Sequence, residues 1–209
     1  MALIYENKIP TQYQADFLKR VREISSDLSI DPNWLMAIMA FETANTFSPS
    51  KKNQIGCIGL LQFCPDASRL GYKTIGGKRY LLSDLAKMTP VQQLDVVYEY
   101  LKQYKGQIKS YVDTYFAVFF PLAIGKDDNW VIEGNGLSAS EIYNDNPAFR
   151  KVKDGKIRVW EVKATILSKL PKEWLNDGSF SLAYKAYKNY LFLGVGLMVV
   201  GYLIYKKYG

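Results

Sequence analysis

One stretch constrains the fold more than any other, because it predicts a helix that is apolar on nearly every face. Asp31 is a good N-cap residue, and Pro32 suits the first helical position, so we expect the helix to begin there. The apolar side chains that follow are Trp34, Leu35, Met36, Ile38, Met39 and Phe41. A helix without a polar face is predicted to be buried at the centre of a domain.

Glu42 lies near the C-terminal end of this helix, on the same stripe as Leu35 and Met39. A carboxylate on that stripe is partly desolvated, and desolvation raises the pKa of a carboxyl group. The negative end of the helix dipole acts in the same direction. A glutamic acid that keeps its proton near neutral pH can serve as a general acid. The alternative is a solvated surface glutamate, which the helix position alone favours.

The segment from Gly59 to Phe63 bears on the choice between a functional and a surface role for Glu42. It places a glycine, a short apolar run and one amide after a polar loop, residues 45–58, that is rich in Ser, Lys and Asn. The tetrapeptide Gly-Leu-Leu-Gln alone is a weak signal. Its pairing with a glutamate on an upstream buried helix is more specific, and it favours a functional role for Glu42.

These segments together resemble the first two motifs of the lytic transglycosylases of the lysozyme-like superfamily, in which Glu-Ser or Glu-Thr is followed by Gly-Leu-Met-Gln. The wider run is similar to versions carried by bacteriophage virion proteins, and the resemblance covers roughly residues 10–170. The matching stretches are Phe41–Thr43, Phe47–Ser50, Gly59–Phe63, Met88–Leu94 and Tyr115–Pro121.

The resemblance implies a mainly α, lysozyme-like domain (goose-type or soluble lytic transglycosylase-like) over residues 1–172, with Glu42 as the catalytic residue. In that family a Tyr of an Ala-Tyr-Asn motif contacts the catalytic glutamate. The run 108–120 holds no Tyr-Asn pair, so Tyr115 is the choice for this role, and a plain core aromatic is the alternative. The residues implied for substrate binding are Gly59, Leu60, Gln62, Phe63 and Tyr115.

The chemistry implied by the resemblance needs only one carboxylate. Glu42 protonates the glycosidic oxygen between N-acetylmuramic acid and N-acetylglucosamine. It then takes the proton of the muramyl 6-hydroxyl as a 1,6-anhydro ring closes. Most glycoside hydrolases use two carboxyl groups. Asp66 and Asp84 are the nearest downstream candidates for a second one, so a lysozyme-type hydrolase is the alternative.

Composition narrows the chemistry further. The chain has no histidine, which excludes Ser-His-Asp and Cys-His catalysis and His-ligated metal sites. We expect neither a metal nor a cofactor. The formal net charge of +7 favours an anionic partner such as a cell wall or a phospholipid surface. No nucleic-acid-binding signature accompanies this charge, so nucleic acid is not expected as a partner.

Two cysteines, Cys57 and Cys64, lie one on each side of the Gly-Leu-Leu-Gln segment. The short span permits a disulfide if both side chains face inward, and a disulfide would hold this loop. Two cysteines do not make a disulfide framework, so a pair of small apolar free thiols is the favoured alternative.

Helical periodicity predicts further helices over 11–28, from Pro90 to about Tyr104, and over 108–120 and 160–170. Gly76-Gly77 lies between two short β-favouring runs, which predicts either a small hairpin or a loop at a cleft rim. Residues 125–150 are expected to be irregular.

The segment from Arg150 to Glu161 fits the frame of a twelve-residue EF-hand loop, with Gly155 at its turn position. Its first and third positions are Arg150 and Val152, which offer no carboxylate, and the neighbouring lysines repel a cation. We expect the loop to keep its turn and the following helix without calcium. A plain turn at Gly155 is the alternative.

A linker is predicted at 173–186 and a C-terminal transmembrane helix at 187–207. The run from Tyr190 to Tyr205 carries no charge, whereas a spanning helix needs about 20 apolar residues. Tyrosines and lysines at both ends suit membrane interfaces. A buried core helix is the alternative. Residues 1–10 lack the pattern of a cleavable signal peptide.

We therefore expect a membrane-anchored lytic transglycosylase in a virion membrane or the host cell envelope. Its expected partners are peptidoglycan strands, a lipid bilayer and other virion proteins, and its expected role is to open the wall during genome delivery or cell lysis. One alternative is a catalytically inactive lysozyme-like module that has a structural role or binds peptidoglycan. Another alternative is a holin-like membrane protein, although a protein of that kind would not need the globular core.

Overall fold

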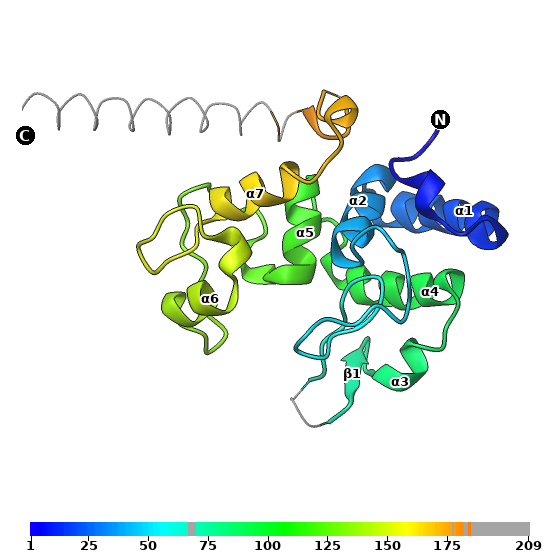
Figure 1. Cartoon of the computed structure of the whole chain (residues 1–209), viewed down its shortest axis with the longest axis horizontal. Coiled ribbons are helices and arrows are strands. Elements are labelled where there is room, and N and C mark those ends of the chain that lie inside the picture. The colour runs from blue at the N-terminus through cyan, green and yellow to red at the C-terminus, as the bar shows by residue number, and fades with distance from the viewer. Residues whose placement is uncertain (67–69, 177, 182–183, 185–209) are drawn as a thin grey trace, which may run out of the picture. The chain divides into compact units, whose positions relative to one another are not determined.

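The structure, a computed structural model, describes residues 1–66, 70–176, 178–181 and 184 (Figure 1). Within these residues the chain is mainly helical, which confirms the expected α class. The expected linker falls partly within them, and the transmembrane helix expected at 187–207 lies outside them. In the part of the chain that the structure describes, no helix is long and apolar enough to cross a membrane.

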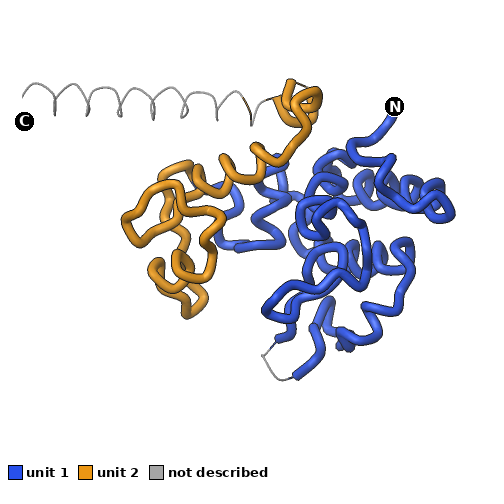
Figure 2. The backbone as a smooth tube through the Cα atoms, in the orientation of Figure 1, with its two compact units in different colours: residues 1–126 blue, residues 127–209 orange. Residues whose placement is uncertain are grey.

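The chain falls into two compact units, residues 1–126 and the residues from Asp127 onward (Figure 2). The described part of the first unit consists of helices and one antiparallel hairpin. The α-helices are α1 (Thr11–Leu28), α2 (Pro32–Glu42), α3 (Leu82–Leu85), α4 (Pro90–Leu101) and α5 (Tyr111–Phe119), the strands are β1 (Tyr72–Ile75) and β2 (Lys78–Leu81), and short 3-10 helices lie at Glu6–Lys8, Lys102–Tyr104 and Pro121–Ala123.

α2 is the buried central helix that the sequence predicts. The side chain of Asp31 accepts a hydrogen bond from the backbone N–H of Asn33, and Pro32 opens the helix. Every side chain from Leu35 to Ala40 is buried. α2 packs against both α1 and α5, and α1 also packs against α4. The core of this unit is therefore arranged around the helix that ends in Glu42.

The predicted helix starts follow their capping residues. Thr89 forms a capping box with Gln92 at the start of α4, where the sequence places it. α5 begins at Tyr111, because the Ser110 side chain accepts a hydrogen bond from the backbone N–H of Asp113. The helix is therefore a little shorter than the predicted 108–120.

Of the two interpretations of the Gly76-Gly77 segment, the hairpin is correct. β1 and β2 pair antiparallel, with Thr74 opposite Arg79 and Ile75 opposite Lys78. Gly76 and Gly77 have φ angles of 56° and 79°, as a type I′ turn requires. Ile75 is buried, and β1 packs against α4.

The second unit contains α6 (Ala139–Asp145) and α7 (Val159–Leu167), with 3-10 helices at Pro147–Phe149 and Lys172–Trp174. The expectation of irregular structure throughout 125–150 was wrong for α6. Ser138 and Glu141 form a capping box there, which satisfies the first backbone N–H groups of this short helix.

Candidate active site

Glu42 is the last residue of α2, and it is half-buried. The chain turns away directly after it, because the fully buried Thr43 caps the helix end. Its hydroxyl donates to the carbonyl of Met39 at 2.6 Å and accepts from the backbone N–H of Phe47 at 3.0 Å. The threonine of the Glu-Thr pair therefore fixes the helix terminus that carries the carboxylate.

The environment of Glu42 keeps its carboxyl group protonated. Burial raises the pKa of Glu42 from its ordinary 4.5 to about 8. Desolvation is the sole cause of this shift among the described residues, so no charged group acts on this carboxyl appreciably. No described side chain forms an ion pair with it either. A carboxyl group in this state can donate a proton near neutral pH.

Three tyrosines from α4 and α5 lie within electrostatic reach of this carboxyl group. Burial raises the pKa of Tyr100 to about 12, and the charges of Tyr104 and Glu42 contribute to the rise. Burial also raises the pKa values of Tyr111 and Tyr115, and the Glu42 carboxylate again contributes to both. Tyr115, chosen from the sequence, is therefore one of several tyrosines within electrostatic reach of Glu42. Tyr100 and Tyr111 were not predicted from the sequence.

Tyr115 and Tyr100 each belong to a series of aromatic contacts. On one side, Phe41 meets Tyr115 edge-on with ring centroids 5.4 Å apart, and Tyr115 stacks on Phe119 at 5.8 Å. On the other side, Tyr100 contacts the ring of Phe63 at 5.8 Å and that of Tyr104 at 6.4 Å. The half-buried members of this set, which water reaches, are Phe41, Tyr100, Tyr104 and Phe119. Aromatic faces of this kind suit the apolar faces of sugar rings.

The Gly-Leu-Leu-Gln segment is a closed loop. Cys57 and Cys64 form a disulfide across it, so the favoured interpretation as free thiols was wrong. Inside the disulfide, Ile58 and Phe63 exchange backbone hydrogen bonds of 3.0 and 2.7 Å. The amide nitrogen of Gln62 donates to the carbonyls of Lys51 and Gly59 at 2.9 and 3.1 Å. Gln62 was predicted to bind sugar, but its amide nitrogen is hydrogen-bonded within the loop itself.

Gln93 anchors this loop to α4, and it is fully buried. Its Oε1 accepts a 2.7 Å hydrogen bond from the backbone N–H of Leu60. Its Nε2 donates to the carbonyls of Pro49 and Leu85 at 3.2 and 2.8 Å. The Gln93 side chain also occupies the space beside Gly59, where a Cβ atom would lie 2.3 Å from Oε1.

Four of the predicted substrate-binding residues lie in this loop and Tyr115 lies in α5, but most of the five are buried. Leu60, Phe63 and Tyr115 are each at most 3% exposed, and Gly59 is buried as well. Gln62 is half-buried and adopts a left-handed backbone with φ of 48°. Leu60 and Phe63 hold the loop against α4, and only Gln62 among the predicted residues offers a partly exposed polar side chain.

The two aspartates considered as a second carboxylate are engaged elsewhere. Asp66 accepts from the backbone N–H of Thr74 at 2.8 Å and pairs with Lys73 at 3.1 Å, and these contacts hold its pKa below the usual range. Asp84 pairs loosely with Lys87 at 3.8 Å and borders an open depression of about 370 Å³. Neither charge contributes to the pKa of Glu42.

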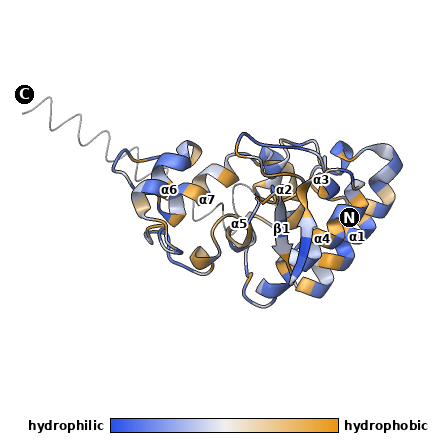
Figure 3. Ribbon diagram, turned by 90° about the horizontal axis from the view of Figure 1, so that it is seen from below, coloured by the Kyte–Doolittle hydropathy of each residue, from blue (hydrophilic) through white to orange (hydrophobic). Residues whose placement is uncertain are grey.

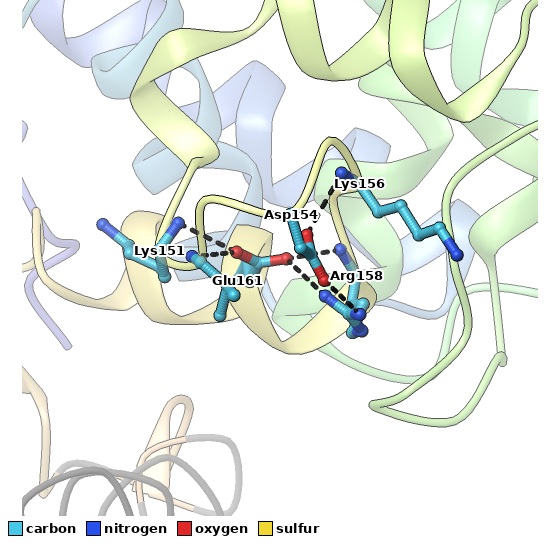
Figure 4. Close-up of polar contacts among 6 residues, drawn as sticks. Lys151, Asp154, Lys156, Arg158 and Glu161 are labelled. Atoms are coloured by element: carbon cyan, nitrogen blue, oxygen red, sulfur yellow. Dashed lines mark hydrogen bonds and ion pairs between the residues drawn. The ribbon is translucent and has the colours of Figure 1, made fainter. Parts of the chain in front are cut away.

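The EF-hand-like loop is closed by the protein's own groups (Figure 4). Glu161 is fully buried at the last loop position and accepts hydrogen bonds of 2.8 to 2.9 Å from the backbone N–H groups of Lys151, Val152 and Arg158. The Arg158 guanidinium binds Asp154 at 2.6 Å. Among the described residues, no three His, Cys, Asp or Glu side chains gather as a metal site would require. The turn and the following helix α7 are present, as expected.

Comparisons of the chain with protein-family models, curated proteins and solved structures found no match.

Proposed function

We propose that the chain is a lytic transglycosylase that cleaves the bond between N-acetylmuramic acid and N-acetylglucosamine in peptidoglycan. The observation that carries the proposal is Glu42, a desolvated carboxyl group with a pKa of about 8 at the end of a buried helix. The partly exposed aromatic rings beside it suit a glycan strand. We also propose that the helical domain is lysozyme-like, on the sequence resemblance described above.

The proposed mechanism uses Glu42 twice. As the acid, it donates its proton to the glycosidic oxygen, and the bond from the muramyl C1 to that oxygen breaks. The Glu42 carboxylate then removes the proton from the muramyl 6-hydroxyl, whose oxygen bonds to C1. The products are a 1,6-anhydromuramyl end and a free N-acetylglucosamine 4-hydroxyl, and Glu42 is protonated again. Burial favours the protonated form that begins the cycle.

The surroundings of Glu42 support this route over hydrolysis by two carboxylates. In retaining and inverting glycosidases the two carboxyl groups lie roughly 5 to 9.5 Å apart. A second carboxylate at such a distance would raise the pKa of Glu42 by charge repulsion. Desolvation alone causes the observed shift among the described residues, and Asp66 is engaged with Lys73 and Thr74.

The direct test digests purified Gram-negative peptidoglycan with the full chain and reads the masses of the soluble products. We expect muramyl ends that are lighter by one water than the reducing ends a hydrolase leaves. Reducing muramyl ends would contradict the transglycosylase and return attention to Asp66 and Asp84.

The second candidate is a peptidoglycan-binding or structural module without catalysis. It is favoured by one observation, the engagement of the Gln62 amide nitrogen with loop carbonyls instead of a free position in a cleft. A folded chain that binds peptidoglycan without cleaving it would support this candidate. The virion and envelope setting, and the membrane anchor at 187–207, remain proposals that rest on the sequence.

A further inference from the structure

The β1–β2 hairpin carries an unusual concentration of basic and aromatic side chains. Its register places Tyr72, Thr74, Arg79 and Leu81 on one face. On this face Arg79, Thr74 and Leu81 are exposed, while Ile75 on the opposite face is buried. Figure 3 colours one of the two strands strongly hydrophilic, in agreement with Lys78 and Arg79 on β2.

Aromatic rings hold the two basic side chains at the turn end of β2. The guanidinium carbon of Arg79 lies 4.8 Å from the centre of the Tyr72 ring, on the same face. The ammonium nitrogen of Lys78 lies 5.0 Å from the centre of the Tyr80 ring. Such cation–π contacts restrain a long side chain and leave its N–H groups available at the edge.

The cations of the hairpin differ in whether a carboxylate neutralises them. Lys73 pairs with Asp66 at 3.1 Å, and this ion pair sits at the start of β1. Neither Lys78 nor Arg79 forms an ion pair with any described carboxylate. Arg79 on the exposed face and Lys78 on the opposite face are therefore exposed cations without an ion-pair partner among the described residues.

The hairpin lies beside the helix that carries part of the candidate active site. A Cβ atom on Gly76 would lie 3.0 Å from Oε2 of Glu99, so the tip of the hairpin rests on α4. The next residue of α4 is Tyr100, whose ring contacts Phe63 and whose pKa responds to Glu42. The hairpin and Tyr100 are therefore connected through α4, and this is the structural link between the hairpin and the candidate active site.

We propose that Arg79 and Lys78 bind the carboxylates of the stem peptides that branch from a peptidoglycan strand. This inference rests on the proposed function and extends it to a second contact with the same substrate. A guanidinium held flat binds a carboxylate through two parallel hydrogen bonds, which an ammonium cannot reproduce. The net charge of +7 draws the same anionic polymer to the protein.

The test measures binding without cleavage. The full chain with Glu42→Gln is mixed in non-ionic detergent with purified Gram-negative peptidoglycan, and the bound fraction is measured by sedimentation. Lys78→Ala with Arg79→Ala is expected to weaken binding roughly tenfold at low salt, the size of a lost charge-assisted contact. Lys151→Ala with Lys153→Ala removes the same charge from exposed positions of the second unit and is expected to weaken binding much less than the hairpin variant does.

A second probe identifies the ligand as a carboxylate. Peptidoglycan whose carboxyl groups have been amidated with carbodiimide and glycinamide should bind the hairpin variant and its parent equally. A difference that persists on amidated peptidoglycan would overturn the proposal, as would equal losses in the hairpin and control variants. A hairpin-dependent interaction found only with phosphatidylglycerol vesicles would assign the surface to lipid instead.

The outcome is separable from that of the proposed function, because binding is measured in a chain that lacks Glu42. Cleavage by the wild-type chain combined with binding independent of Arg79 would overturn the hairpin assignment alone. Binding that depends on Arg79, in a chain whose wild type cleaves nothing, would overturn the catalytic proposal alone.

Discussion

The backbone N–H of Leu60 donates a 2.7 Å hydrogen bond to Oε1 of Gln93, which lies 33 residues later in the chain. Through this bond, α4 holds the Gly-Leu-Leu-Gln loop. The same side chain reaches the carbonyls of Pro49 and Leu85, so one buried amide joins three segments. The Leu60 N–H and the Pro49 carbonyl would otherwise be buried without a partner.

We predict that Gln93→Leu destabilises the protein by roughly 2–4 kcal/mol. Leucine has a similar size but leaves the Leu60 N–H and the Pro49 carbonyl without partners, whereas the Leu85 carbonyl keeps the backbone N–H of Met88. Each buried group without a partner carries a desolvation penalty of about 1–3 kcal/mol. Chemical unfolding measures the loss. Gln54→Ala, on an exposed residue of the same loop, is the control and should change stability by less than about 0.5 kcal/mol. Equal effects of the two variants would contradict the anchoring role.

Gly59→Ala is expected to destabilise the loop much more than Gly56→Ala. Both glycines have positive φ angles, 83° and 90°, so alanine is strained at either position. At Gly56 the added Cβ meets nothing closer than 3.9 Å, whereas at Gly59 it meets the Gln93 amide at 2.3 Å. The comparison of unfolding midpoints therefore isolates the steric conflict from the backbone strain. Similar unfolding midpoints for the two variants would mean that the Gln93 side chain moves aside without a loss of stability, and this would contradict the predicted steric conflict.

The pH dependence of kcat/KM should follow the protonated form of Glu42. Its pKa of about 8 leaves the acid protonated at neutral pH, so we expect kcat/KM to fall as the pH rises through about 8. Release of soluble fragments from peptidoglycan, measured at constant ionic strength, gives the profile. An activity that instead falls through pH 5 would assign the acid to a carboxyl group with an ordinary pKa.

Glu42→Gln should make the protein more stable at pH 8 than the wild type. The folded-state pKa of about 8 exceeds the ordinary 4.5, so the wild type loses stability as the pH rises between these values. Glutamine does not titrate and avoids this loss. We expect a gain on the order of 2 kcal/mol at pH 8, after allowance for the partial exposure of the side chain, and little pH-dependent gain at pH 4.5. A difference between variant and wild type that is independent of pH would contradict the desolvation of Glu42.

The sequence predicted the parts of the fold that local patterns determine. The N-cap at Asp31, the helix start at Pro90 and the apolar composition of α2 each specify their own segment, and the structure has all three. The capping pair Ser138 and Glu141 carries the same kind of signal and would have predicted α6. Glu42 was found because a carboxylate on an apolar stripe is visible as a break in the pattern.

The parts that were missed depend on contacts between distant segments. Gln93 is a polar residue in an amphipathic helix, and a pattern assigns such a residue to the surface. Only the fold brings it to Leu60. Spacing alone could not decide whether Cys57 and Cys64 bond, because the answer depends on how Ile58 and Phe63 pair inside the loop. Tyr100 and Tyr111 resemble other core aromatics until Glu42 is placed beside them.

The most direct test of the account compares the wild-type full chain with Glu42→Gln on Gram-negative peptidoglycan, with products identified by mass. Asp66→Asn and Asp84→Asn are the matched controls, since each removes one carboxylate that does not act on Glu42. We predict anhydromuramyl ends from the wild type and both controls, and none from a folded Glu42→Gln chain. Anhydromuramyl ends released by the Glu42→Gln chain at the wild-type rate would contradict the assignment of Glu42 as the acid and base.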